Sequence, residues 1–197
     1  MVVPEASTTH LATVAMSSGR DREAHRNDEV GKYPMRNLEE LNINEGGEPI
    51  DRPAPSTDDT RRFVEHFGVS LPEDYTTLLL FANGGCPEVN SFTYYDGEGE
   101  SAVNCFYRLT SDRTDLYGVW RRTEHLRKVL SDANIANDVI AVGENGGGDD
   151  ILLNMSNIPP SVHILYRTSG NSMPKIADSF GEFVDSLYYE PDEYEDI

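Results

Sequence analysis

The sequence predicts an α+β domain whose sheet is largely antiparallel and carries flanking helices. Two amphipathic helices come first, strand-like runs interrupted by one helix follow, and a further helix closes the chain. This order lacks the strict strand–helix alternation of a doubly wound parallel sheet. We place the domain at residues 51–197 with an acidic C-terminal tail. Residues 1–50 form an N-terminal arm that is loosely attached or wraps around it.

The two leading helices have start and stop signals. Thr57–Phe67 can be capped by Ser56 or Thr57 and precedes Gly68, which tolerates the left-handed conformation. The second helix follows Ser70-Leu-Pro-Glu73, whose spacing predicts a capping box. It ends at Asn83-Gly84-Gly85, and its predicted inward-facing residues are Tyr75, Leu78, Leu79 and Ala82.

A β-hairpin follows. Ser91–Asp96 and Ala102–Leu109 are rich in aromatic and β-branched residues, and Gly97-Glu98-Gly99 between them predicts a turn with an acidic tip. The next helix is predicted over Asp115–Leu130, where Leu116 contributes to the apolar stripe. Its outer surface is predicted to be basic because of four residues: Arg121, Arg122, Arg127 and Lys128.

The stretch Val139–Met155 reads as strand, glycine-rich acidic turn, strand. Its run of glycines lets the backbone take positive φ or approach another group closely. Val162–Tyr166 and Lys175–Ala177 are predicted to be the last strands, and Asp178 is predicted to cap a closing helix. The glycine turn therefore lies either at the tightest corner of the fold or on its working edge.

The charge balance bears on the class of partner. With 35 acidic and 16 basic side chains, the net charge is −19, which excludes non-specific attraction to nucleic acid and disfavours anionic membranes. It favours a basic partner, although acidic excess also keeps an ordinary protein soluble. Cys86 and Cys105 show no CxxC spacing, so we expect two reduced thiols and a reducing compartment. The start of the chain does not resemble a secretory signal, so we expect a cytoplasmic protein.

Known catalytic and cofactor motifs do not fit. Asp149 and Asp150 stand where a phosphate-binding loop needs Lys and then Ser or Thr, and they would repel phosphate. The turn offers oxygen ligands for a hard cation but lacks EF-hand spacing. The five histidines show no HExxH pairing, and no serine lies in a GxSxG motif. We therefore expect no catalysis, no cofactor and no metal.

A binding surface remains as the best interpretation. The hairpin tip, the glycine turn and the acidic tail together present carboxylates that suit capture of arginine from a basic partner, with tyrosines beside them. A solvated acidic face with core tyrosines is the alternative. The candidate partner-binding residues are Tyr94, Tyr95, Glu98, Glu100, Glu144, Asp149 and Asp150.

The order of three motifs resembles the SUKH superfamily. Leu71-Pro72-Glu73-Asp74-Tyr75 and Asn83-Gly84-Gly85 are similar to its "LP-x-D/E-Y…NGG" opening. The segment Val142–Asp149 is similar to its "IGxxGGGD" turn, and Ile176–Phe180 with Phe183 to its closing "IADSFEEFL" helix. The resemblance covers about Thr57–Tyr189 and does not reach the N-terminal arm.

The resemblance implies a non-catalytic α+β protein. Most bacterial members are immunity proteins that bind and block a polymorphic toxin of a contact-dependent, type VI or Rhs system, often a nuclease. Eukaryotic relatives include yeast cell-wall assembly regulators, which act as interaction hubs. We therefore expect an immunity protein for a basic toxin domain, with a regulatory scaffold as the alternative. A metal-dependent hydrolase that uses the glycine turn is a third, weaker hypothesis.

Overall fold

The structure, a computed structural model, describes residues 35–97, 99–131, 136–167, 170 and 172–191. The chain divides into two units, Met1–Tyr33 and Pro34–Ile197, and the elements described here belong to the second. The first part of the predicted arm, Glu98 at the hairpin tip and the acidic tail from residue 192 lie outside the described residues. Within the described part of the chain, no helix is long and apolar enough to cross a membrane.

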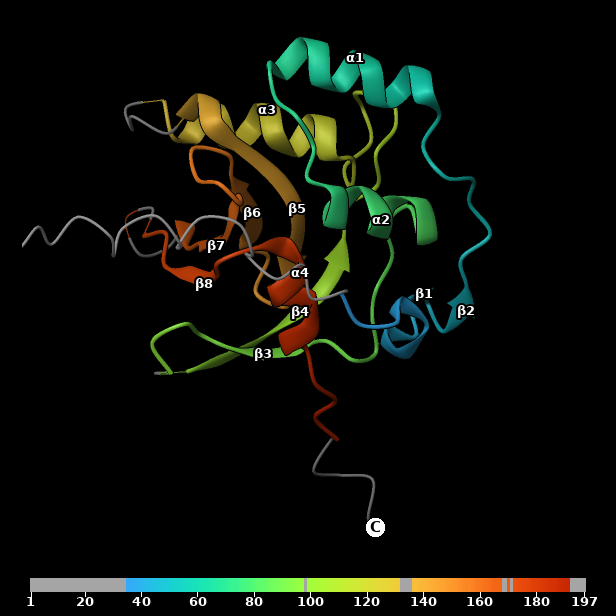
Figure 1. The fold of residues 1–197 in the computed structure, drawn as a ribbon, viewed down its shortest axis with the longest axis vertical. Helices are drawn as coiled ribbons and strands as arrows, with labels where there is room; N and C mark the ends of the chain where they lie inside the picture. The colour runs from blue at the N-terminus through green and yellow to red at the C-terminus, as the bar shows by residue number, and fades with distance from the viewer. Residues whose placement is uncertain (1–34, 98, 132–135, 168–169, 171, 192–197) are drawn as a thin grey trace, which may run out of the picture. The chain divides into compact units, whose positions relative to one another are not determined.

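The domain combines helices with an antiparallel sheet (Figure 1), which confirms the predicted α+β class. A short helix and a small hairpin come first: η1 (Leu38–Leu41), β1 (Asn44–Glu45) and β2 (Glu48–Pro49). The helices that follow are α1 (Thr57–Phe67), α2 (Glu73–Phe81), α3 (Val119–Val129), η2 (Ala136–Asp138) and α4 (Phe180–Ser186). The strands are β3 (Ser91–Thr93), β4 (Glu100–Phe106), β5 (Val139–Asn145), β6 (Asp150–Asn154), β7 (Ser161–Leu165) and β8 (Lys175–Ala177).

The six strands β3 to β8 are neighbours in the same order as in the sequence, and every pair is antiparallel. Most of these neighbouring strands are joined by short connections, but the segment between β4 and β5 is long and contains α3 and η2. The glycine turn joins β5 to β6, where Glu144 pairs with Asp150, and Asp150 pairs in turn with Leu165 of β7. Strands β5 and β6 have buried side chains along nearly their whole length, so the turn projects from the centre of the sheet.

Helices cover both faces of the sheet. The ring of Phe106 packs against Phe180 of α4, whereas Tyr107, the next residue, contacts Arg122 of α3. Because successive side chains in an extended chain point to opposite faces, α3 and α4 lie on opposite sides. Helix α1 packs on α3 through Phe63 and Trp120, whose ring centroids are 5.8 Å apart.

Local sequence signals explain the first two helices in part. Ser56 and Asp59 form a capping box at the start of α1, and Gly68 ends the helix with φ of 66°. The capping box predicted at Ser70 is wrong: α2 begins after Pro72, which provides no side-chain cap. Pro72 suits this position because its missing N–H would have no partner inside the helix.

Helix α3 is shorter than the predicted Asp115–Leu130, because Asp115 is bonded to Arg108 and to the backbone N–H of Tyr117 instead. Leu116, predicted to lie in the apolar stripe, is 61% exposed. The predicted basic outer surface is also incorrect in part. Arg122 reaches into the sheet, and Arg127 lies over the ring of Phe67 at 4.8 Å.

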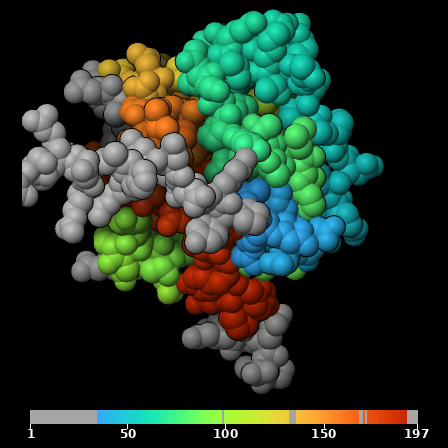
Figure 2. Space-filling view, in the orientation of Figure 1, coloured from blue at the N-terminus to red at the C-terminus, as the bar shows by residue number. Residues whose placement is uncertain are grey.

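The last third of the predicted arm, residues 35–50, is packed onto the domain. Leu38 and Leu41 of η1 belong to the hydrophobic core, and Arg36 donates a hydrogen bond to the carbonyl oxygen of Leu187 at 2.6 Å. In Figure 2, this early segment (blue) lies against α2 and the C-terminal residues, drawn green and red. Residues 35–50 therefore make contacts with the core and with the segment after α4.

The expectation of two reduced thiols is wrong, because Cys86 and Cys105 form a disulfide. The chain after α2 runs beside β4, where Gly85 and Phe106 exchange backbone hydrogen bonds. This pairing brings the two cysteines together although they are 19 residues apart. The cysteines consequently give no support to the expected reducing compartment.

Candidate functional site

The predicted binding residues gather at one end of the sheet. Because all neighbouring strands are antiparallel, the ends of β3, β5 and β7 lie beside the starts of β4, β6 and β8. Three connections meet here: residues 94–99, residues 146–149 and the segment after Leu165. We call this region the turn end of the sheet. The six candidate residues that the structure describes belong to it, and Glu98 lies outside the described residues.

Asn145 organises the glycine turn. Its side-chain oxygen accepts hydrogen bonds from the backbone N–H groups of Gly147, at 3.0 Å, and Asp149, at 2.8 Å. The backbone N–H of Gly148 donates to the carbonyl oxygen of Asn145 at 3.0 Å, and Gly148 has φ of 79°. The exposed glycines are therefore held by a nearly buried amide. Sequence reasoning did not identify this role.

Asp150 is fully buried behind the turn and binds two arginines. Its Oδ1 lies 2.9 Å from Nη2 of Arg122 on α3, and its Oδ2 lies 2.6 Å from Nη2 of Arg167. The hydroxyl of Tyr107 donates to Oδ1 at 3.0 Å. A buried carboxylate must be paired and hydrogen-bonded in this way, because an isolated charge in the interior is very unfavourable.

Glu144 joins the same network. Its Oε2 is 3.1 Å from both the Tyr107 hydroxyl and Nη2 of Arg122. Two carboxylates and two guanidinium groups give the cluster no net charge. Burial, followed by the charge of Asp150, raises the pKa of Tyr107, so its phenol stays protonated and donates. Burial opposes the charge on Arg122, but Tyr107, Asp150 and Glu144 outweigh it and raise the pKa of that guanidinium.

This geometry corrects the predicted surface role of Asp150, because a fully buried carboxylate cannot touch a partner. Glu144 has a side chain only 15% exposed and is engaged by Arg122. Both residues instead hold the base of the glycine turn. Tyr107, Arg122 and Arg167 complete the cluster and were not predicted to belong to it. The alternation of side chains along a strand could at most have predicted that Tyr107 and Glu144 lie on the same face of the sheet.

The remaining candidates lie nearer the surface. Asp149 is partly exposed, with its Oδ1 3.4 Å from the backbone N–H of Arg167, and Glu100 is exposed at the start of β4. Tyr95 is 56% exposed, lies over the ammonium of Lys175 at 3.7 Å and donates to Asp178 at 3.3 Å. The hydroxyls of Tyr94 and Tyr166 are hydrogen-bonded to each other. The turn end thus joins a tyrosine-lined hairpin to a turn of exposed backbone.

The chemistry of this site suits recognition. Tyr107 and Arg122 are held in their protonated forms, so these two side chains fix the geometry of the cluster and do not exchange protons near neutral pH. Among the residues that the structure describes, no group of three or more His, Cys, Asp or Glu side chains is arranged to hold a metal ion.

The comparison with known families agrees with this fold. A sequence profile of the SMI1 / KNR4 family (SUKH-1) matches residues 54–186. The chain belongs to this family. The matched SUKH-1 region includes α1 to α4 and the whole six-stranded sheet. The match leaves out η1 and the β1–β2 hairpin, which precede residue 54. A search of curated proteins found no match.

Proposed function

We propose that this SUKH-1 protein is an immunity protein that binds a cognate polymorphic toxin and neutralises it by covering the active site or an exosite. Membership of the SUKH-1 family carries the proposal. A basic toxin domain, such as a nuclease, is favoured by the net charge of −19, since complementary fields steer association. In this proposal the protein acts in the cytoplasm by stoichiometric binding and uses no cofactor.

The proposed contact surface is the turn end of the sheet. Glu100 and Asp149 supply carboxylates for a basic partner, together with Glu98 from the sequence prediction, and Tyr95 supplies an aromatic side chain. Tyrosine suits this use because it combines apolar area with a polar tip. The buried pair Asp150 and Glu144 positions the turn from below. A rigid turn loses little conformational freedom on binding.

Survival and binding measurements test the proposal. Cells that express the neighbouring toxin gene should survive only when this protein is co-expressed. The double variant Glu100→Lys with Asp149→Lys should slow association with the purified toxin about tenfold and flatten its salt dependence. The matched control is Asp58→Lys with Glu65→Lys, which makes the same change in charge on exposed residues of α1. Equal rates for the two double variants would remove the turn end as the interface.

The family description also names SMI1 and KNR4, so a regulatory scaffold is the second candidate function. The two functions differ in what the protein binds when no toxin is present. A scaffold should co-purify from its own cells with the same set of host proteins, and the Tyr95→Ala variant should lose some of them. An immunity protein should bring down the toxin in a 1:1 complex.

A further inference from the structure

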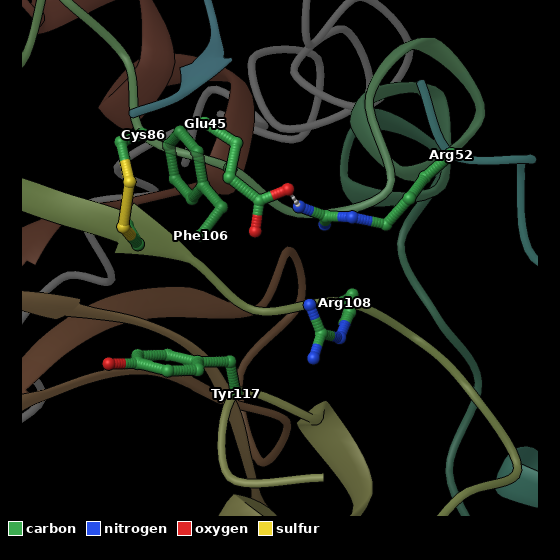
Figure 3. A pocket seen from close by; sticks show the side chains of 8 residues that line it. Glu45, Arg52, Cys86, Phe106, Arg108 and Tyr117 are labelled. Carbon is green, nitrogen blue, oxygen red and sulfur yellow. Dashed lines mark hydrogen bonds and ion pairs between the residues drawn. A yellow bond between two sulfur atoms is a disulfide. The ribbon is translucent and has the colours of Figure 1, made fainter. Parts of the chain in front are cut away.

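A pocket of about 220 Å³ lies away from the turn end, between the β1–β2 hairpin and the segment that leads from β4 to α3. Glu45, Arg52, Arg108 and Tyr117 line it, together with the Cys86–Cys105 disulfide and Phe106. Figure 3 shows the side chains of Glu45, Arg52 and Arg108 directed toward the same space. The pocket is smaller than the usual site for a drug-sized ligand, so its volume suits a single side chain or a small acid.

Two guanidinium groups are held in place at this pocket. Arg52 donates from Nη1 to the carbonyl oxygen of Asn83 at 2.9 Å, and its side chain is 21% exposed. Arg108 is bound through Nε and Nη2 to Asp115, whose own side chain is 7% exposed. Because this forked bond uses one edge of the guanidinium, Nη1 of Arg108 points away from Asp115. Both arginines are fixed before any ligand arrives.

Glu45 fills the place between them. Its carboxylate forms an ion pair with Arg52, and the hydrogen bond and charge of Arg52, with a smaller effect of Arg108, lower the pKa of Glu45. Yet the side chain of Glu45 is 62% exposed, and Glu45 precedes the two glycines of a hairpin with two-residue strands. An exposed ion pair contributes little to stability, so Glu45 can leave at small cost. The arginines are rigid and their carboxylate is replaceable.

We propose that this pocket is a binding site for a carboxylate, which exchanges with Glu45 between Arg52 and Arg108. The carboxylate belongs either to a small free acid or to an Asp or Glu side chain of a partner protein. Arginine suits this ligand because its planar fork matches the geometry of a carboxylate. The site lies outside the surface proposed for the toxin and does not depend on that proposal.

Nuclear magnetic resonance of the full-length protein tests the site directly. Acetate is titrated at constant ionic strength while the Nε–H signals of Arg52 and Arg108 are followed. Both signals should shift and saturate, and Glu45→Ala should tighten binding about fivefold by removing the internal competitor. Glu48→Ala is the matched control, because it removes an exposed carboxylate from the same hairpin that does not line the pocket.

A second titration identifies the source of the carboxylate. A capped Gly-Ser peptide with one central Glu is compared with the same peptide carrying Gln. Binding of the Glu peptide alone indicates a partner side chain, and binding of acetate without the Glu peptide indicates a free acid. The proposal is overturned if neither probe gives saturating shifts at Arg52 and Arg108. Equal affinities in wild type, E45A and E48A would also overturn it.

Discussion

The hydroxyl of Tyr107 donates a hydrogen bond to Oδ1 of the buried Asp150, 3.0 Å away and 43 residues later in the chain. This bond joins the end of β4 to the start of β6, across the intervening strand β5. Arg122 donates to the same hydroxyl from α3 at 2.9 Å, so three elements meet at one phenol. The glycine turn is thus built on a polar cluster inside an otherwise apolar layer, and its shape depends on that cluster.

The first prediction concerns the charge of Asp150. Replacing Asp150 by Asn should lower the free energy of unfolding by about 3 kcal/mol, because two arginines and a phenol lose their buried counter-charge. Urea unfolding followed by tryptophan fluorescence measures the change. Asp149→Asn is the control, since Asp149 is partly exposed and its side chain accepts two long hydrogen bonds of 3.4 Å, from the backbone N–H of Arg167 and from Nδ2 of Asn145. It should change the stability by less than about 0.5 kcal/mol. Equal losses would contradict the assigned role.

The second prediction concerns the amide that holds the turn. Asn145→Ala removes the acceptor of two backbone N–H groups and should destabilise the protein by about 1 to 2 kcal/mol. Hydrogen exchange of the backbone amides of Gly147 and Asp149 should accelerate, while the relative exchange rates of the amides in the strands should stay the same. Asn104→Ala is the control, because Asn104 is exposed and makes one 3.3 Å bond to Glu144. Unchanged exchange at Gly147 in N145A would show that the turn keeps its shape without the amide.

Much of the fold follows from local signals. Of the two predicted caps for α1, Ser56 caps the helix, Gly68 ends it as predicted, and β8 covers the predicted Lys175–Ala177. The prediction was wrong where two adjacent polar residues could each cap the same helix. Asp178 resembles an N-cap, but it pairs with Lys175, and Ser179 caps α4 instead. A capping preference of about 1 kcal/mol cannot distinguish adjacent polar residues when tertiary contacts decide.

The site was harder to predict because its contacts are distant in sequence. The glycine turn was located correctly, but Asp149 and Asp150 look alike in a sequence. Asp150 is the buried one, because it lies within the sheet between Glu144 and Leu165. Arg122 sits on a helix with other basic residues, and nothing local separates it from Arg121, which is exposed. The sheet register and the docking of α3 together determine which charges meet.

The third prediction is a dependence of stability on pH. Burial and nearby Lys175 lower the pKa of His163, although the carbonyl oxygen of Met173 works in the opposite direction. The unfolded state, with a histidine pKa near about 6.5, therefore binds more protons than the folded state just below that pH. The free energy of unfolding should fall as pH decreases from about 6.5 toward the folded pKa.

Urea unfolding between pH 7.5 and 5.5 measures this loss, and His163→Gln should reduce it. The proton spectrum of His163 provides the control, because the same imidazole should titrate at a lower pH in the folded protein than in urea. In the folded state Nδ1 donates to Met173 O at 3.2 Å, which leaves Nε2 to accept from the Ser161 hydroxyl at 2.8 Å. If the pKa of His163 is the same in the folded protein as in urea, the predicted dependence of stability on the protonation of His163 is absent.

The fourth prediction separates two glycines of the same motif. A Cβ built on Gly143 would lie 2.8 Å from the backbone oxygen of Cys105, so Gly143→Ala must push β5 away from β4 and should cost about 1 to 3 kcal/mol. Gly146 has nothing within 4 Å of the same atom, and its φ lies outside the left-handed region. Gly146→Ala should leave the stability unchanged or raise it slightly, because alanine restricts the unfolded chain. Thermal unfolding of both variants measures the difference, and an equal loss would mean that the motif needs flexibility at both positions. A loss at Gly143 alone would show that close contact between neighbouring strands requires that glycine.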